Sequence, residues 1–115
     1  MASPKRELLG LLGLARRAGA VASGTEAVRR AIREGEARLV LTAADASLVQ
    51  LDKIRKTMRD RPIPQASLWD RSTLGAAMGR APLSAVAVTH ASFAGRLLEG
   101  LTGAGHACGT AGAEE

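Results

Sequence analysis

Apolar residues along this chain occur in two alternating patterns, one typical of helices and the other typical of buried strands. Leu8, Leu11, Leu12 and Ala15 recur at helical spacing after Pro4, which suits a first helical turn. The same spacing predicts helices over residues 4–17, 23–35, 47–61, 70–79 and 91–101. Short apolar runs predict strands over residues 21–22, 38–45, 65–69 and 84–90.

This alternation of helices and strands predicts the fold class. Helices that follow short apolar strands along the whole chain are typical of an α/β protein built as a three-layer α/β/α sandwich. A length of 115 residues suits a single domain, which we place at residues 1–101. Residues 102–115 are rich in glycine and alanine and offer little to bury, so we expect them to form a disordered tail.

The charge balance indicates a polyanionic partner. The chain has 16 Lys and Arg against 11 Asp and Glu, and 13 of the cations are arginine, which suits phosphate oxygens and guanine edges. Without Glu114 and Glu115 in the tail, residues 1–101 carry a net charge of +7. A basic surface that only keeps the protein soluble is the alternative, and composition leaves it open.

Several classes of protein fit the sequence poorly. No apolar run is long enough to span a membrane, and the lone Cys108 is typical of a reducing compartment, so we expect a cytoplasmic protein. His90, His106 and Cys108 are too sparse for a metal site. No nucleotide-binding glycine motif or arranged nucleophile is present, so we predict no cofactor and no enzymatic activity. We interpret His90 as a helix-cap or surface residue.

Asp45 and the few aromatic residues bear on which kind of RNA the protein binds. Asp45 follows a strand, where α/β proteins often place functional groups, but we favour a role as the cap of the next helix. Trp69 and Phe93 are the only aromatic residues, too few for a platform on which bases stack. A structured, bent RNA held by arginines and a helix N-terminus fits better than a flexible single strand.

The predicted helix at residues 23–35 is the candidate RNA-binding element. Helical geometry places its apolar residues on one side and a polar group on the other, namely Glu26, Arg29, Arg30 and Arg33. The arginines can meet phosphates or guanine edges, and Glu26 can accept from base amino groups. The alternative remains open: Ser23 and Glu26 are spaced as a capping box, and arginines opposite an apolar stripe are ordinary solvated residues.

The stretches SGTEAVRRAIREGEARLVLTAADAS and RSTLGAAMGRAPLSAVAVTHASFA resemble the kink-turn-binding ribosomal protein family, most closely its small bacterial YlxQ-like branch. The resemblance covers roughly residues 5–100. It implies a mixed four-stranded sheet, no enzymatic activity, and binding to sharply bent RNA at tandem G·A pairs. The resemblance and the polar face of the helix at residues 23–35 together give the predicted RNA-binding residues: Gly24, Thr25, Glu26, Arg29, Arg30, Arg33, Arg80, Ala81 and Pro82.

The resemblance assigns roles to two segments. In the family, an Asn-Glu pair and a following Lys enter the major groove of the kink, and the matching residues here are Thr25, Glu26 and Arg29. Thr25 lacks the carboxamide of the family asparagine. The loop before the last strand, residues 79–83, matches the segment that lies over an extruded nucleotide.

We therefore expect a monomeric, cytoplasmic RNA-binding protein with ribosomal or small structured RNA as its partner, associated with the ribosome or translation and not with a membrane. Two alternatives remain. The same fold can serve as a protein-interaction adaptor, or as an RNA-recognition module that works with a separate RNA-modifying enzyme.

Overall fold

A computed structural model of the chain describes residues 4–103 and 109–111. Within these ranges the helices are α1 (Pro4–Arg17), α2 (Thr25–Arg33), α3 (Leu48–Thr57), α4 (Arg71–Ala77) and α5 (Ala91–Gly103). The strands are β1 (Val21–Ser23), β2 (Leu39–Thr42), β3 (Ile63–Ser67), β4 (Ala85–Val88) and β5 (Gly109–Ala111).

The strands form one mixed sheet in the order β1-β4-β2-β3-β5. β2 and β3 are parallel, whereas β4 runs antiparallel to both of its neighbours, β1 and β2. The predicted α/β class and its mixed four-stranded sheet are thus confirmed in β1 to β4. β5 extends the sheet by pairing antiparallel with β3, and no strand was predicted there.

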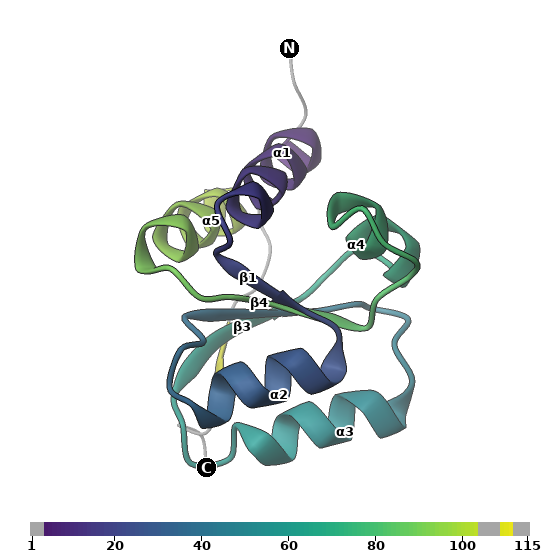
Figure 1. Cartoon of the computed structure of the whole chain (residues 1–115), viewed down its shortest axis with the longest axis vertical. Helices are drawn as coiled ribbons and strands as arrows, with labels where there is room; N and C mark the ends of the chain where they lie inside the picture. The colour runs from purple at the N-terminus through teal and green to yellow at the C-terminus, as the bar shows by residue number, and fades with distance from the viewer. Residues whose placement is uncertain (1–3, 104–108, 112–115) are drawn as a thin grey trace.

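Helices cover both faces of the sheet, as Figure 1 shows, with α1, α4 and α5 on one face and α2 and α3 on the other. Successive residues of a strand point to opposite faces, so Leu39 and Leu41 of β2 pack in the first layer and Val40 packs in the second. On the α2 side, β4 contributes only Ala85 and Ala87. These small side chains let α2 lie close to the sheet.

The prediction of a disordered tail from residue 102 needs correction. α5 continues to Gly103, and residues 109–111 form β5. Sheet pairing is made by backbone groups, so a segment of glycine, threonine and alanine can add an edge strand without an apolar side-chain pattern. Residues 104–108 and 112–115, including His106 and Cys108, lie outside the described residues.

Most of the predicted elements differ from the observed ones in their bounds, and two of the differences have a clear physical reason. β3 begins at Ile63 and includes Pro64, whereas a strand was expected only from Gln65. Proline is tolerated near the start of a strand, where its missing N–H matters least. The helical spacing that predicts residues 47–61 includes both Leu48 and Ile54, but 83% of Leu48 is exposed while Ile54 is buried. Leu48 is the first residue of α3 and lies beyond the layer that the helix packs on.

Candidate nucleic-acid interface

The start of α2 has no side-chain cap. Gly24 is the N-cap residue with φ 97° and ψ 155°, a conformation that favours glycine, and no side chain accepts a hydrogen bond from the first turn. Ser23 and Glu26 therefore do not form the capping box that the sequence left open as an alternative. Ser23 belongs to β1, where it pairs with Val86, so the helix begins after it. The amide groups of the first turn stay available to an external acceptor.

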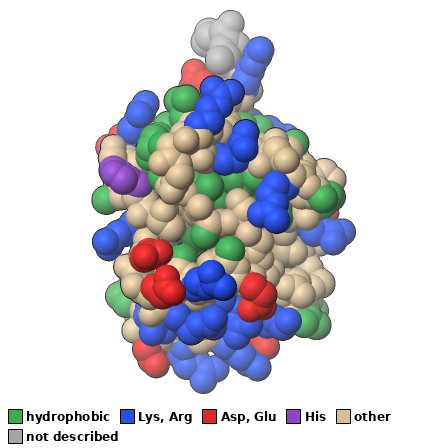
Figure 2. Space-filling view, in the orientation of Figure 1, with side chains coloured by type: hydrophobic (Ala, Val, Ile, Leu, Met, Phe, Trp, Pro, Cys, Tyr) green, Lys and Arg blue, Asp and Glu red, His purple; other side chains and the backbone are tan. Residues whose placement is uncertain are grey.

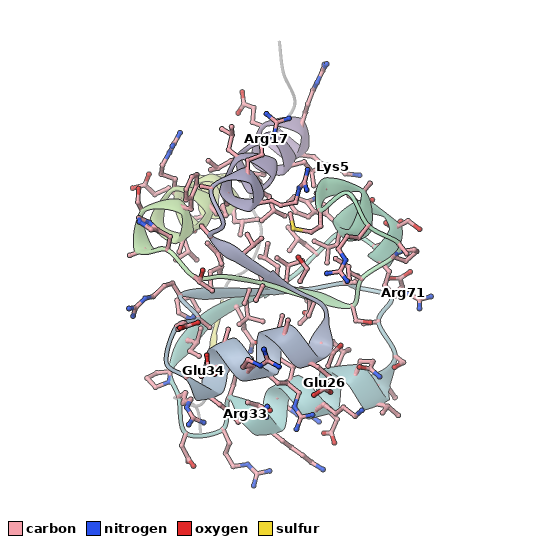
Figure 3. All side chains as sticks on the ribbon, in the orientation of Figure 1. Lys5, Arg17, Glu26, Arg33, Glu34 and Arg71 are labelled. Atoms are coloured by element: carbon pink, nitrogen blue, oxygen red, sulfur yellow. The ribbon has the colours of Figure 1, made fainter. Side chains whose placement is uncertain are left out.

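The two faces of α2 agree with the helical pattern. Val28, Ala31 and Ile32 are buried, and Glu26, Arg30 and Arg33 are exposed. Figure 3 shows Glu26 near the beginning of α2 and Arg33 near its end. The polar side of this helix therefore faces solvent at its beginning and at its end.

Arg29 differs from the other arginines of α2. Its Nε donates to Thr57 Oγ1 of α3 at 3.1 Å, and its Nη1 forms an ion pair with Glu26 Oε2 at 3.1 Å. The Arg29 side chain is 28% exposed, against 67% for Glu26. Arg29 thus joins α2 to α3, and Arg30 and Arg33 are the α2 cations most available to a ligand.

The loop between α4 and β4 exposes the remaining predicted site residues, Arg80, Ala81 and Pro82. This loop is packed down on α4 at Gly75. A Cβ atom at Gly75 would collide with the backbone of Ala81 and would lie 2.9 Å from Pro82 Cα. The Arg80 amide donates to the Gly75 carbonyl at 2.8 Å. The close approach therefore requires glycine at position 75.

The start of α2 and the α4–β4 loop lie side by side. A Cβ atom at Gly24 would be 3.9 Å from Leu83 Cδ2, and the Gly24 amide donates to the Ala85 carbonyl at 2.9 Å. Thr25 follows Gly24 directly and is half-buried, whereas Pro82, just before Leu83, is exposed. The structure thus joins the two predicted segments into one surface.

Asp45 helps to fix this arrangement, although not as predicted. It was expected to cap α3, but Ser47 is the N-cap there, and Asp45 Oδ1 instead accepts from the Arg71 amide of α4 at 2.8 Å. Asp45 Oδ2 also lies 3.6 Å from Arg71 Nε. The Arg71 carbonyl in turn accepts from the Leu83 amide at 3.1 Å. Asp45 is therefore a structural residue that holds α4 and, through it, the loop.

Asp70 is the N-cap residue of α4, and its carboxylate accepts from the Thr73 amide at 2.7 Å. Hydrogen bonding to Thr73 also lowers the pKa of the Asp70 carboxyl below its ordinary value. The start of α4 is thus stabilised by two carboxylates, one from Asp70 and one from Asp45.

Arg16 of α1 is a neighbour of the loop that the sequence interpretation did not include among site residues. A Cβ atom at Gly79 would lie 3.5 Å from its Cζ and Nη1 atoms and 3.6 Å from Nη2. In the sequence, Arg16 was recognisable only as a cation in the last turn of a helix. No periodicity indicates which loop a distant helix end will touch.

Basic side chains collect on the α2–α3 side of the molecule. Figure 2 shows blue Lys and Arg side chains spread over the lower part of this face, with a few acidic side chains among them. On α3, Asp52 pairs with Arg55 at 2.6 Å and with Lys56 at 3.1 Å, and hydrogen bonds from both cations lower the pKa of its carboxyl. α2 and α3 each carry three cations against one carboxylate, so this side of the molecule has a net positive charge.

His90 is exposed, and its Nδ1 accepts from the Ser92 amide at 3.2 Å at the start of α5, which agrees with the predicted cap or surface role. Among residues 4–103 and 109–111, no group of three or more His, Cys, Asp or Glu side chains could hold a metal ion. No helix in the same ranges is long and apolar enough to cross a membrane.

These features define a small α/β/α protein with an uncapped helix start, an exposed loop beside it and a basic helical face. The chain belongs to the Ribosomal protein L7Ae/L30e/S12e/Gadd45 family, whose model matches residues 6–97.

Similar proteins agree with this assignment. The chain is 37% identical over 92 residues to "RNA-binding protein YlxQ" of Bacillus subtilis (strain 168), covering 80% of this chain and 92% of that protein. A solved structure of a protein of unknown function from Bacillus halodurans is 30% identical with a TM-score of 0.77, over 83% of this chain and 96% of that one. The Giardia lamblia 15.5kD RNA binding protein shares the fold, with a TM-score of 0.70 at 20% identity, over 90% of this chain and 89% of that one.

Proposed function

We propose that this protein binds RNA and recognises a sharply bent, kink-turn-like structure through the start of α2 and the α4–β4 loop. The observation that carries the proposal is the proximity of these two segments: the Gly24 amide donates to the Ala85 carbonyl just after the loop, and a Cβ atom at Gly24 would lie 3.9 Å from Leu83 Cδ2. Neither segment alone is specific, but together they offer backbone donors, a carboxylate and small exposed side chains on one surface. That combination suits an RNA whose bend brings a groove and an unstacked nucleotide close together.

The start of α2 supplies the groove-reading part. Its first-turn amides and the positive end of the helix dipole favour phosphate or base acceptors. Glu26 is exposed next to these amides and can accept from base amino groups. Arg30 and Arg33 follow on the same helix and provide phosphate contacts, while Arg29 holds Glu26 and α3 in place.

The α4–β4 loop supplies the second part. Ala81 and Pro82 are exposed and small, so a nucleotide can lie against them without displacing a large side chain. The packing at Gly75 fixes the backbone of this loop before RNA arrives, which reduces the entropy lost on binding. Arg80 adds a positive charge at the edge of the loop.

Similarity to an RNA-binding protein of Bacillus subtilis supports RNA as the partner. The family description, which names ribosomal proteins, supports an association with ribosomal RNA or translation. On this account the protein works in the cytoplasm as a monomer, and it acts by binding rather than by catalysis.

A second candidate function is that of a protein-interaction adaptor. Leu48 is 83% exposed and Val49 is 64% exposed at the start of α3, and large apolar side chains that face solvent as neighbours are typical of contact surfaces. A protein partner at this position and an RNA on the α2 side are compatible, because the two surfaces belong to different helices.

The RNA proposal is tested by comparing two labelled RNAs of equal length, one with a kink-turn and one a continuous duplex. We expect the bent RNA to bind more tightly, and Glu26→Ala to weaken its binding by about 1 to 3 kcal/mol. Glu34→Ala is the matched control, because Glu34 is also exposed but lies at the other end of α2, as Figure 3 shows. Equal affinity for both RNAs, or equal effects of the two substitutions, would contradict the proposal.

Thr25→Asn provides the complementary gain of function. It introduces the carboxamide that is typical of the family and adds a bidentate hydrogen-bonding group at the start of α2. Tighter binding to the kink-turn, with little change for the continuous duplex, is the expected result. Adaptor function predicts instead that Leu48→Ser abolishes capture of a protein partner while RNA binding is unchanged.

A further inference from the structure

Arg16, at the end of α1, lies against the loop of the proposed RNA site. Its Cζ, Nη1 and Nη2 atoms are almost equally distant, at 3.5 to 3.6 Å, from the position that a Cβ of Gly79 would take. Points that are equally distant from three atoms of a planar group lie on a line perpendicular to its plane. Because this distance is more than twice the C–N bond length of the guanidinium, the Cβ position lies above its face and not in its plane. Arg16 therefore covers Gly79 with its flat face.

This face-on contact leaves the edge of the guanidinium free. The N–H donors of arginine lie in the plane of the group, so packing one face on a glycine consumes none of them. Within the described residues, no carboxylate forms an ion pair with Arg16, and its side chain is exposed. A charged, orientated donor edge thus remains available beside the loop.

Gly79 is the residue from which the exposed loop departs. Its φ of 63° lies in the left-handed region. The chain then continues through Arg80 to Pro82 and reaches Leu83, which lies beside the start of α2. A group that sits on Gly79 is therefore at the opposite end of the loop from Gly24. Arg16 and the start of α2 flank the loop on its two sides.

We propose that Arg16 is a phosphate-binding residue of this protein, which clamps the RNA backbone next to the nucleotide that lies on the α4–β4 loop. The inference rests on the proposed function, because it assigns a further residue to the same RNA surface. A planar guanidinium with free edge donors matches the bidentate geometry of a phosphate.

Arg17 is the natural control. It belongs to the same last turn of α1, carries the same charge and is also exposed. Figure 3 shows Arg17 on the side of α1 that is remote from the sheet and from the α4–β4 loop. Arg16 and Arg17 therefore have the same charge, the same helix propensity and neighbouring positions in α1. They differ in that only Arg16 lies against the loop.

The test measures binding to the labelled kink-turn RNA over a range of salt concentrations. Arg16→Ala should weaken binding about threefold to tenfold and reduce the slope of log affinity against log salt by about one unit, as expected for one lost phosphate contact. Arg16→Lys should keep the slope and recover part of the affinity, because it retains the charge without the fork. Arg17→Ala should leave affinity and slope nearly unchanged.

Two results would overturn the assignment while the proposed function stands. In the first, the wild type prefers bent RNA and Arg16→Ala matches Arg17→Ala. In the second, Arg16→Ala and Arg16→Lys weaken binding equally with the slope unchanged, which means that Arg16 only supports the loop. Failure of the wild type itself to prefer bent RNA overturns both proposals. Circular dichroism of each variant confirms that it is folded.

Discussion

Replacing Gly75 by alanine should reverse the usual effect of such a substitution in a helix. Alanine normally stabilises a helix interior by about 0.5 to 1 kcal/mol relative to glycine. At Gly75 the new methyl group would collide with the carbonyl group of Ala81 and lie 2.9 Å from Pro82 Cα, and both obstacles are backbone atoms that cannot rotate away. The loop must therefore move off α4.

The expected size follows from three contributions. Overpacking of a tight contact costs about 1 to 3 kcal/mol. Loss of the hydrogen bond from the Arg80 amide to the Gly75 carbonyl costs about 1 kcal/mol more. After the gain in helix propensity, Gly75→Ala should lower the free energy of unfolding by about 1 to 3 kcal/mol, or roughly 4 °C in Tm for each kcal/mol.

Gly95→Ala is the matched control in another helix. Among the described residues, no atom beyond its chain neighbours and the backbone of its own helix lies within 4 Å of the position that a Cβ of Gly95 would take. This substitution should therefore stabilise the protein by the ordinary helix increment of about 0.5 to 1 kcal/mol. Urea unfolding of both variants gives the comparison, and kink-turn binding by Gly75→Ala should be weaker because its loop is displaced. A stabilised Gly75→Ala protein with unchanged RNA binding would mean that the loop does not depend on its close approach to Gly75.

Three further predictions concern electrostatics and helix contacts. Because the pKa of the Asp70 carboxyl is lowered in the folded state, its cap stabilises the protein fully above the unfolded-state pKa and loses this effect as the pH falls through the folded-state pKa. The urea midpoint of the wild type should therefore approach or fall below that of Asp70→Asn in acid. A constant difference between the two midpoints would count against this. Thr57→Val should lower the free energy of unfolding by about 0.5 to 1.5 kcal/mol by removing the acceptor of Arg29, whereas Thr57→Ser should not. Wild-type affinity for bent RNA should fall with salt at a log–log slope of about −3 to −4, and a flat dependence would exclude phosphate contacts.

The faces of α2 were predictable from sequence because a helix period sorts side chains independently of the rest of the fold. Val28 and Ile32 are buried and Arg33 is exposed, as the spacing requires. The first residue of the helix was not predictable in the same way. Ser23 and Glu26 have the spacing of a capping box, but Ser23 pairs with Val86 in the sheet instead, so the helix begins after it.

The juxtaposition that defines the candidate site also lies beyond sequence patterns. In the sequence, Gly75 is only a glycine inside a predicted helix. Position 75 requires glycine because the backbone of the chain six residues later packs against it. The contact of Gly24 with Leu83 depends on β1 and β4 being neighbours in the sheet. Arg16 reaches Gly79 only because α1 and α4 cover the same face of that sheet. The resemblance to a family pointed to both segments but gave no reason in this chain for their contact.

β5 illustrates a different limit. Residues 109–111 carry no apolar alternation, so composition predicted disorder, yet their backbone pairs with β3 from Ile63 to Gln65. Edge pairing of this kind satisfies backbone groups and needs no particular side chain. Composition describes what a segment can bury and not which open strand edge lies within its reach.

The central claim is that the start of α2 and the α4–β4 loop form one RNA-binding surface. The most direct test is to titrate the isotope-labelled protein with an unlabelled kink-turn RNA and to follow its backbone amide signals by NMR. If the two segments form one surface, the largest amide shifts should occur together at Thr25 to Ala27 and at Arg80, Ala81 and Leu83, with small shifts along the exposed side of α5. An equally long continuous duplex should not reproduce this pattern. Shifts that fall mainly on α5, or on only one of the two segments, would contradict the claim.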